Sequence, residues 1–187
     1  MANAPERVFA EYLVVLAQAG EPRAFARLVA HWQPRLLAHA ARLSGRADAA
    51  RDAVQDAWLA IARGIARLDD PARFGVWAYR IVTRKCADAM RGEIRARRTN
   101  AAFAAEPTGV PPPAPDAEIL AGDAAVALRR ALAALSPDHR AVLGLFYADE
   151  MSVGDIASVL GIPPGTVKSR LFHARNHLKH ALERSSS

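Results

Sequence analysis

The sequence predicts an all-α protein made of two small helical domains joined by a proline-rich linker. Over most of the 187 residues, apolar residues recur at spacings of three and four, as they do on one face of a helix. No segment alternates apolar and polar residues between hairpin turns, so a β-sheet is not supported. The composition agrees, because alanine, leucine and arginine are frequent and favour helix over strand.

Three amphipathic helices are expected in a first domain over 1–98. The apolar stripes of the first two helices run over 25–43 and 54–68. A third stripe follows Pro71, whose fixed backbone angle suits the first turn of a helix. Because each stripe needs a partner to bury it, the three helices are expected to share one core.

The composition changes between Thr99 and Glu118. Five of the chain's twelve prolines lie in this segment, and no lysine or arginine does. Proline favours an extended backbone, at about 3.1 Å per residue, so the segment could separate two domains widely. A rigid loop within one domain is the alternative, but loops longer than about 15 residues are uncommon in compact folds. We therefore expect an acidic, proline-rich linker over 99–118.

The second expected domain, over 119–187, carries signals for two helices joined by a tight turn. Ser152 and Asp155 have the spacing of a capping box, with aspartate in place of the preferred glutamate. Gly161 can end that short helix in a left-handed conformation, and Pro164 suits the first turn of the next one. A short helix, a glycine-containing turn and a longer helix form the arrangement of a helix-turn-helix.

The longer helix has an outer face that could enter a DNA groove. At about 100° per residue, this face lies opposite the apolar stripe, and the helix N-terminus offers backbone donors to a phosphate. An ordinary helical hairpin with a solvated basic face explains the helix pattern equally well. Opposite the core lie Gly165, Ser169, Phe172, His173 and Asn176, with Thr166, Lys168, Arg170 and Arg175 on the flanks.

The strongest local charge bias lies between Pro71 and Asn100, where eight basic residues stand against two acidic ones. Lysine and arginine near phosphates release counterions and gain affinity for nucleic acid. A solvated face is possible, but two basic helices joined by a linker without basic residues favour bipartite nucleic-acid binding. Phe74, Trp77 and Tyr79 lie among these residues, and exposed aromatics can stack on unpaired bases, although core packing is favoured for Phe74 and Trp77. The basic candidates are Arg73, Arg80, Arg84 and Arg91, with Lys85 beside them.

No catalytic, metal or cofactor site is evident. The sequence holds no glycine-rich phosphate loop, nucleophile elbow or helical His-Glu metal motif. His173, His177 and His180 share one side of the last helix, yet three ligands from one helix rarely close around a metal. Cys86, the only cysteine, allows no internal disulfide and is expected to be buried, which fits a cytoplasmic protein. The apolar stretch over 12–17 is too short for membrane insertion and lacks the flank of a secretion signal.

Taken together, these segments resemble the extracytoplasmic-function group of bacterial RNA polymerase sigma factors. The segments 52–58 and 74–81 are similar to the first conserved domain of that family, known as region 2. The segments 155–163, 165–171 and 174–175 are similar to its second, region 4. The resemblance implies a sigma factor that binds RNA polymerase core and directs promoter-specific initiation, without enzymatic activity of its own.

The resemblance also assigns roles to residues. Asp48, Asp52 and Asp56 form an acidic stripe that would otherwise be interpreted as a solvated face or an incomplete metal site. Region 4 is implied to read the minus-thirty-five element as duplex, and an anti-sigma protein is implied as a partner. Extruding a base from duplex DNA costs a few kcal/mol. Capture of an already separated strand by region 2 would therefore favour opening of the promoter. The implied polymerase contacts are Asp52, Gln55 and Asp56, and the implied minus-ten contacts are the loop 68–73 with Arg73, Arg80, Arg84, Lys85, Asp88 and Arg91.

The chain departs from the family pattern at 172–173, where a basic residue is frequent, and at 163–164, where Ser is frequent. The promoter preference is therefore not fixed by the resemblance. One alternative is a polymerase-independent helix-turn-helix regulator, which would bind duplex DNA by itself, usually as a dimer. Another is a helical adaptor, which would lose little when Lys168 and Arg170 become alanine. The sigma-factor hypothesis requires the surface around Ser169 to be open to DNA.

Overall fold

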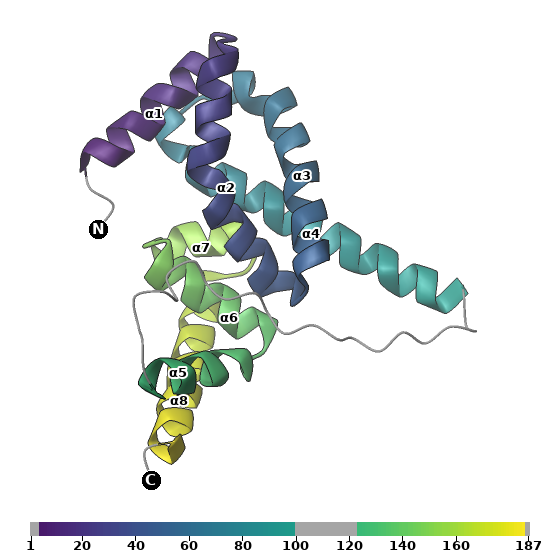
Figure 1. Ribbon diagram of the computed structural model, residues 1–187, viewed down its shortest axis with the longest axis vertical. Helices are drawn as coiled ribbons and strands as arrows, with labels where there is room; N and C mark the ends of the chain where they lie inside the picture. Colours follow the sequence, from purple (N-terminus) through teal and green to yellow (C-terminus); the bar gives the residue numbers. More distant parts are fainter. Residues whose placement is uncertain (1–3, 100–122, 186–187) are drawn as a thin grey trace.

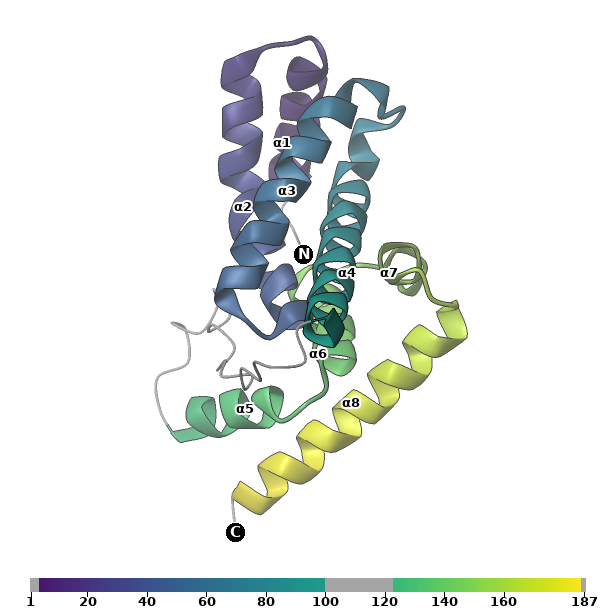
Figure 2. The same cartoon turned by 90° about the vertical axis from the view of Figure 1, so that its right-hand side faces the viewer.

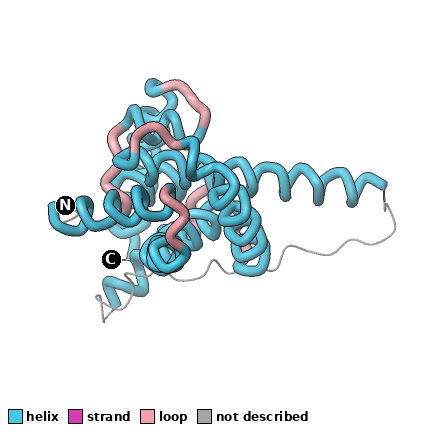
Figure 3. Tube along the Cα trace, turned by 90° about the horizontal axis from the view of Figure 1, so that it is seen from above, coloured by secondary structure: helices cyan, strands magenta, loops and turns pink. Residues whose placement is uncertain are grey.

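The structure, a computed structural model, describes residues 4–99 and 123–185. All regular structure in these two ranges is helical and neither contains a strand, which confirms the predicted all-α class (Figure 3). The predicted linker over 99–118 lies outside the described residues apart from Thr99, the last residue of the fourth helix.

The first part of the chain forms four helices, where the sequence pattern predicted three. The additional helix precedes the others, and its apolar residues lie on all sides, which hides the helical period. Leu13 and Val14 are buried in the bundle, whereas Val8 and Tyr12 are exposed. The four helices are α1 (Ala4–Gln18), α2 (Pro22–Ser44), α3 (Ala47–Gly64) and α4 (Phe74–Thr99) (Figure 1).

Two short 3-10 turns, Ile65–Arg67 and Pro71–Arg73, connect α3 to α4. The side-chain amide of Gln18 donates to two backbone carbonyls around the first turn, at 2.7 and 3.0 Å, and so ties the end of α1 to this loop. The carboxylate of Asp70 caps the second turn by accepting a backbone N–H two residues further on, at 2.9 Å. Pro71 occupies the first position of this turn, as predicted.

Aromatic rings fill the centre of the first bundle. The ring of Trp32 lies 5.6 Å from that of Phe74 and 6.2 Å from that of Tyr79, measured between centroids. Gly75 permits this packing, because a Cβ at that position would stand 2.7 Å from a Trp32 ring carbon. Cys86 is buried as predicted, and burial raises the pKa of its thiol to about 11. The predicted stripes supply the buried residues Leu28, Leu36, Val54, Ile61, Phe74 and Ala78.

The second part of the chain also contains four helices, and the predicted helix boundaries around its turn are confirmed. The hydroxyl of Ser152 accepts the N–H of Asp155 at 3.1 Å, and Gly161 adopts a φ of 66° after the last helical residue. Val167 and Leu171 are buried along the longest helix. The helices are α5 (Asp123–Ala133), α6 (Pro137–Leu143), α7 (Val153–Leu160) and α8 (Pro164–Ser185), with a π-helical turn over Gly144–Ala148.

The two parts pack against each other. Helix α7 contacts α4 and α6 contacts α2, so buried residues of both parts form one continuous apolar cluster (Figures 1 and 2). Arg42 of α2 and Asp149, in the turn before α7, form an ion pair at 2.8 Å. The hydroxyl of Tyr79 on α4 donates to the same carboxylate. The sequence pattern did not predict this contact, because a long linker permits both packed and separated domains.

His39 of α2 is fully buried next to this contact. The hydroxyl of Thr83 donates to the backbone carbonyl of Tyr79 at 2.9 Å, so it accepts from Nε2 of His39 at 2.8 Å. Nδ1 of His39 then has no hydrogen-bond partner, which fits a neutral ring. Burial, with a smaller contribution from Arg42, holds the pKa of His39 well below its usual 6.5.

We expect the free energy of unfolding to fall by about 2 kcal/mol between about pH 7.5 and pH 5. Below about pH 6.5 the unfolded chain protonates His39 while the folded chain does not, which destabilises the folded state by up to about 1.4 kcal/mol per pH unit. Urea denaturation at the two pH values measures the change. The variant His39→Gln should lose most of this dependence, and an equally steep dependence in the variant would assign it to other groups.

Candidate nucleic-acid interface

One side of α3 presents the predicted acidic residues to solvent. Asp52, Gln55 and Asp56 are all exposed, while the positions between them are buried in the bundle. Leu59, three residues after Asp56, shares their side of the helix and is 52% exposed. We call these four residues the acidic face. The apolar periodicity of α3 did not single out Leu59, whereas its spacing from Asp52 and Asp56 could have done so.

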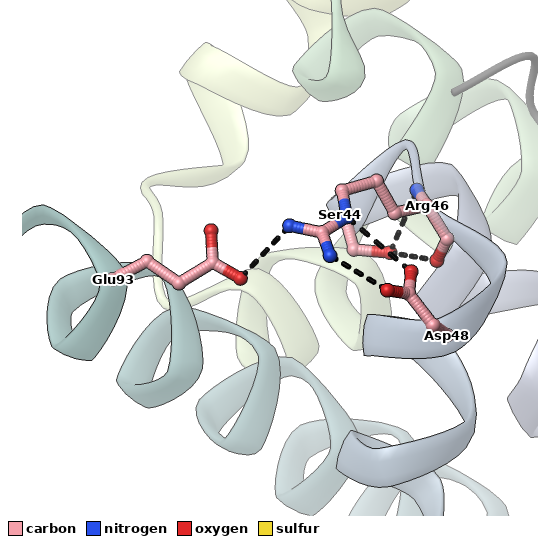
Figure 4. Close-up of polar contacts among 4 residues, drawn as sticks. All are labelled: Ser44, Arg46, Asp48 and Glu93. Carbon is pink, nitrogen blue, oxygen red and sulfur yellow. Dashed lines mark hydrogen bonds and ion pairs between the residues drawn. The ribbon is translucent and has the colours of Figure 1, made fainter. Parts of the chain in front are cut away.

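Asp48, the first residue of the predicted acidic stripe, is engaged within the first bundle. The guanidinium of Arg46 donates to Asp48 at 2.6 Å and to Glu93 of α4 at 3.1 Å (Figure 4). The hydrogen bond from Arg46 lowers the pKa of Asp48 to about 2. The hydroxyl of Ser44 accepts the backbone N–H of Arg46 at 3.4 Å in the same turn. This cluster ties the turn between α2 and α3 to α4.

A second surface runs along α4, whose C-terminal half projects from the bundle (Figure 1). Arg80, Arg84, Asp88 and Arg91 are exposed at spacings of three and four, and we call them the α4 face. Asp88 forms an ion pair with Arg91. Lys85 is half-buried beside them, and its ammonium lies 3.8 Å from the carboxylate of Asp56. The α4 face and the acidic face are thus neighbours.

Two further candidates in this region lie at the contact between the two parts of the chain. Arg73 is exposed, but its guanidinium pairs with Asp155 of α7 at 3.1 Å. Tyr79 is 1% exposed, and burial raises its pKa. The ring of Tyr79 is therefore not available to stack on unpaired bases in this structure. Core packing is confirmed for Phe74, and the half-buried Trp77 packs beside it with ring centroids 6.0 Å apart.

The outer side of α8 is open to solvent, as the sigma-factor hypothesis requires. Lys168, Ser169, Phe172, His173 and Arg175 are exposed there, and we call them the α8 face. Phe172 is 60% exposed although it is the largest apolar residue of the helix. Its exposure on this face gives the helix an apolar group that could contact a thymine methyl.

Several predicted α8 residues, both on the α8 face and beside it, have partners within the protein. Thr166 is half-buried, and its carbonyl accepts the hydroxyl of Ser169 at 3.0 Å. The guanidinium of Arg170 pairs with Asp138 of α6 at 2.6 Å. The guanidinium of Arg175 lies over the ring of Phe146, 5.6 Å from its centroid. These contacts fix the side chains around the edge of the α8 face.

The histidines of α8 do not converge on one point. His177 lies near His139 of α6, with ring centroids 6.1 Å apart, whereas His180 lies 3.5 Å from a carboxylate oxygen of Glu183. Within the described ranges, no group of three histidine, cysteine or acidic residues is arranged to hold a metal ion. These histidines therefore border the α8 face as separate side chains.

Comparison with known proteins assigns both halves of the chain. Residues 28–96 match the family model of Sigma-70 region 2, and residues 125–178 match that of Sigma-70, region 4. The ECF RNA polymerase sigma factor SigM of Mycobacterium tuberculosis is 35% identical over 178 residues, which cover 95% of this chain and 86% of that protein. The chain belongs to the extracytoplasmic-function RNA polymerase sigma factors. It is a promoter-recognising sigma factor of RNA polymerase.

Further known proteins are similar to this chain over most of its length. SigW of Bacillus subtilis is 29% identical over 174 residues, covering 87% of this chain and 91% of that protein. Among solved structures, the sigma factor RpoE in complex with the anti-sigma factor NepR from Bartonella quintana has a TM-score of 0.69 at 27% identity. That match covers 85% of this chain and 96% of RpoE. CnrH in complex with the cytosolic domain of CnrY has a TM-score of 0.63 at 25% identity, covering 94% of this chain and 98% of CnrH.

No helix in the described part of this sigma factor is both long and apolar enough to cross a membrane.

Proposed function

We propose that three surfaces of this sigma factor bind polymerase core, the minus-ten element and the minus-thirty-five element, respectively. The region 2 domain, over 1–98, binds polymerase core and the minus-ten element, and the region 4 domain, over 119–187, binds the minus-thirty-five element. The residues over 99–118 link them. The observation that carries this proposal is that the acidic face, the α4 face and the α8 face are all exposed on the parts of the chain that match regions 2 and 4.

The acidic face docks on the clamp helices of the polymerase large subunit. Its three polar members, Asp52, Gln55 and Asp56, are exposed outside the core of the bundle. When basic residues of a partner approach, the carboxylate of Asp56 exchanges its ion pair with Lys85 for them. Leu59 adds an apolar contact beside them. Complementary charge brings the partners together quickly, and the buried apolar contact slows their dissociation.

The α4 face captures the minus-ten element. Arg80 and Arg84 offer guanidinium groups to the phosphates of a melted strand. Lys85, Asp88 and Arg91 extend the surface along the projecting half of α4. Arg73 joins it when its ion pair with Asp155 is exchanged for a phosphate.

The α8 face reads the minus-thirty-five element in the major groove. Lys168 and Arg175 contact phosphates, while Ser169 and His173 meet base edges. Beside the α8 face, Arg170 meets a base edge when its ion pair with Asp138 is exchanged for DNA, and Thr166 lies at the helix start. Phe172 supplies an apolar contact to a thymine methyl. A histidine and a phenylalanine in these two places set a promoter preference specific to this chain.

An anti-sigma protein is the proposed regulatory partner. RpoE, to which this chain is similar, was solved in complex with the anti-sigma factor NepR, and CnrH was solved with the cytosolic domain of CnrY. An exposed acidic face is available to a protein that competes with polymerase. We place the sigma factor in the cytoplasm, associated with the nucleoid when bound to polymerase, and assign it no catalytic activity of its own.

The variant Arg84→Ala tests the assignment of the α4 face. We expect about a 10-fold loss of open complex, because one phosphate or base contact to the separated strand is removed. Permanganate reactivity of minus-ten thymines in a reconstituted holoenzyme measures opening. The matched control is Arg23→Ala, which removes an exposed arginine of α2 outside all three surfaces. Equal opening by Arg84→Ala and wild type would remove this face from promoter melting.

A further inference from the structure

The contact between the two domains contains a buried charged cluster. The carboxylate of Asp149, in region 4, is 6% exposed and pairs with Arg42 of region 2, whose side chain is 17% exposed. Tyr79, also of region 2, donates its hydroxyl to the same carboxylate. Burial raises the pKa of Asp149 against the opposing effect of Arg42, so the carboxylate depends on both partners to remain charged here.

Each of these side-chain contacts joins a residue of one domain to a residue of the other. Arg42 and Tyr79, which both donate to the Asp149 carboxylate, lie in region 2, whereas Asp149 itself lies in region 4. Gly144 of region 4 allows the approach, because a Cβ there would stand 2.3 Å from Nε of Arg42. The backbone of Gly144 is helical, at φ −60° and ψ −49°, so region 4 itself does not need glycine at this position. Glycine is needed at this position because Arg42 of region 2 approaches so closely.

The packed arrangement cannot reach both promoter elements. Elements centred about 10 and 35 base pairs from the start site are about 85 Å apart along B-form DNA, at about 3.4 Å per base pair. In the packed structure, however, α7 lies directly on α4, and α8 follows α7 after a short turn (Figure 2). The 23 residues over 100–122 have a contour length of at most about 80 Å, which would permit a wide separation. Promoter binding therefore requires the domains to part.

We propose that the Arg42, Asp149 and Tyr79 cluster is an intramolecular latch that holds free sigma factor in a closed, inactive conformation. The acidic face stays exposed in the closed state, so polymerase can dock on region 2 before region 4 is released. Opening exposes the cluster to water and frees Arg73 from Asp155. The inhibitory role rests on the proposed assignment of the two DNA surfaces, whereas the latch itself does not.

The test compares Arg42→Met with a repaired double variant, Arg42→Met combined with Asp149→Asn. The single variant keeps the apolar stem but leaves the Asp149 carboxylate buried without its cation, which favours the open state. In the double variant a neutral amide replaces the buried carboxylate, its oxygen still accepts from the hydroxyl of Tyr79, and closure returns. Gly144→Ala opens the latch by a different route, through steric conflict with Arg42. Arg46→Met is the matched control, because both partners of Arg46, Asp48 and Glu93, lie in region 2.

Small-angle X-ray scattering of the full chain, without polymerase, reports closure. The radius of gyration should rise by about 5 Å or more in Arg42→Met and Gly144→Ala, and return to the wild-type value in the double variant. It should not change in Arg46→Met. An unchanged radius in both opening variants, or a wild-type radius already equal to theirs, overturns the latch.

Run-off transcription with added core polymerase reports inhibition. The protein concentration for half-maximal transcription should fall about 10-fold in Arg42→Met and recover in the double variant, because closure reduces the binding-competent fraction. If the variants open in scattering but need the same concentration as wild type, the latch is not inhibitory. If no protein, wild type included, supports transcription, the proposed promoter function fails while the scattering result still stands.

Discussion

Exchange of Asp52 and Asp56 for lysine is expected to weaken binding to core polymerase by about 100-fold or more. Both carboxylates are exposed and pack against nothing in the core, so the bundle should stay folded. The reversed charges would repel the basic partner surface that the native carboxylates attract, and like charges in an interface cost several kcal/mol. Titration of fluorescently labelled core polymerase with the variant measures the affinity.

The control for this charge reversal is Glu21→Lys, which changes an exposed carboxylate outside the acidic face in the same way. Its affinity for core should stay within about twofold of wild type, because exposed charges away from the interface are screened by salt. Equal affinities for the lysine variant of the acidic face and for the control would place the polymerase contact elsewhere on region 2.

Loss of Lys168 and Arg170 together should reduce run-off transcription from a minus-thirty-five-dependent promoter by about 100-fold. A base-contacting arginine contributes about 1–3 kcal/mol, and a lysine at a phosphate adds a smaller, salt-dependent amount. Core binding should remain intact, because it depends on the acidic face of α3. The alanine double variant is measured beside wild type with the same core preparation.

The ion pair between Arg170 and Asp138 calls for a control of its own. The variant Asp138→Asn breaks this pair but keeps both cations of α8, so it isolates the structural contribution of the pair. We expect less than a threefold loss of transcription, since half-exposed ion pairs contribute little to stability. Wild-type transcription by the alanine double variant would instead favour a helical adaptor without DNA contact.

Local signals predicted much of the fold. The capping serine at 152, Gly161 and Pro164 mark helix ends through backbone hydrogen bonding and dihedral preference, which depend on neighbours in sequence. The stripes of α2, α3, α4 and α8 were found because one side of each helix is buried and the other is not. Helix α1 was missed because Val8 and Tyr12 are apolar yet exposed, which removes the contrast on which periodicity depends.

The contacts between distant residues could not be predicted in this way. Nothing near Tyr79 in sequence indicates that its hydroxyl meets Asp149, 70 residues further on. Arg73 belongs to a basic segment, and only the packing of α7 on α4 shows that it pairs with Asp155. The exposed faces were predictable from helical geometry, whereas the partners of Arg73, Lys85 and Arg170 depend on tertiary structure.

Footprinting of a cognate promoter, with and without core polymerase, tests the division of labour between the two domains most directly. With core present, the sigma factor should protect both the minus-ten and the minus-thirty-five elements, and changes in the α8 face should remove only the upstream protection. Strong protection of symmetric half-sites by the protein without polymerase would contradict the account and favour an independent helix-turn-helix regulator.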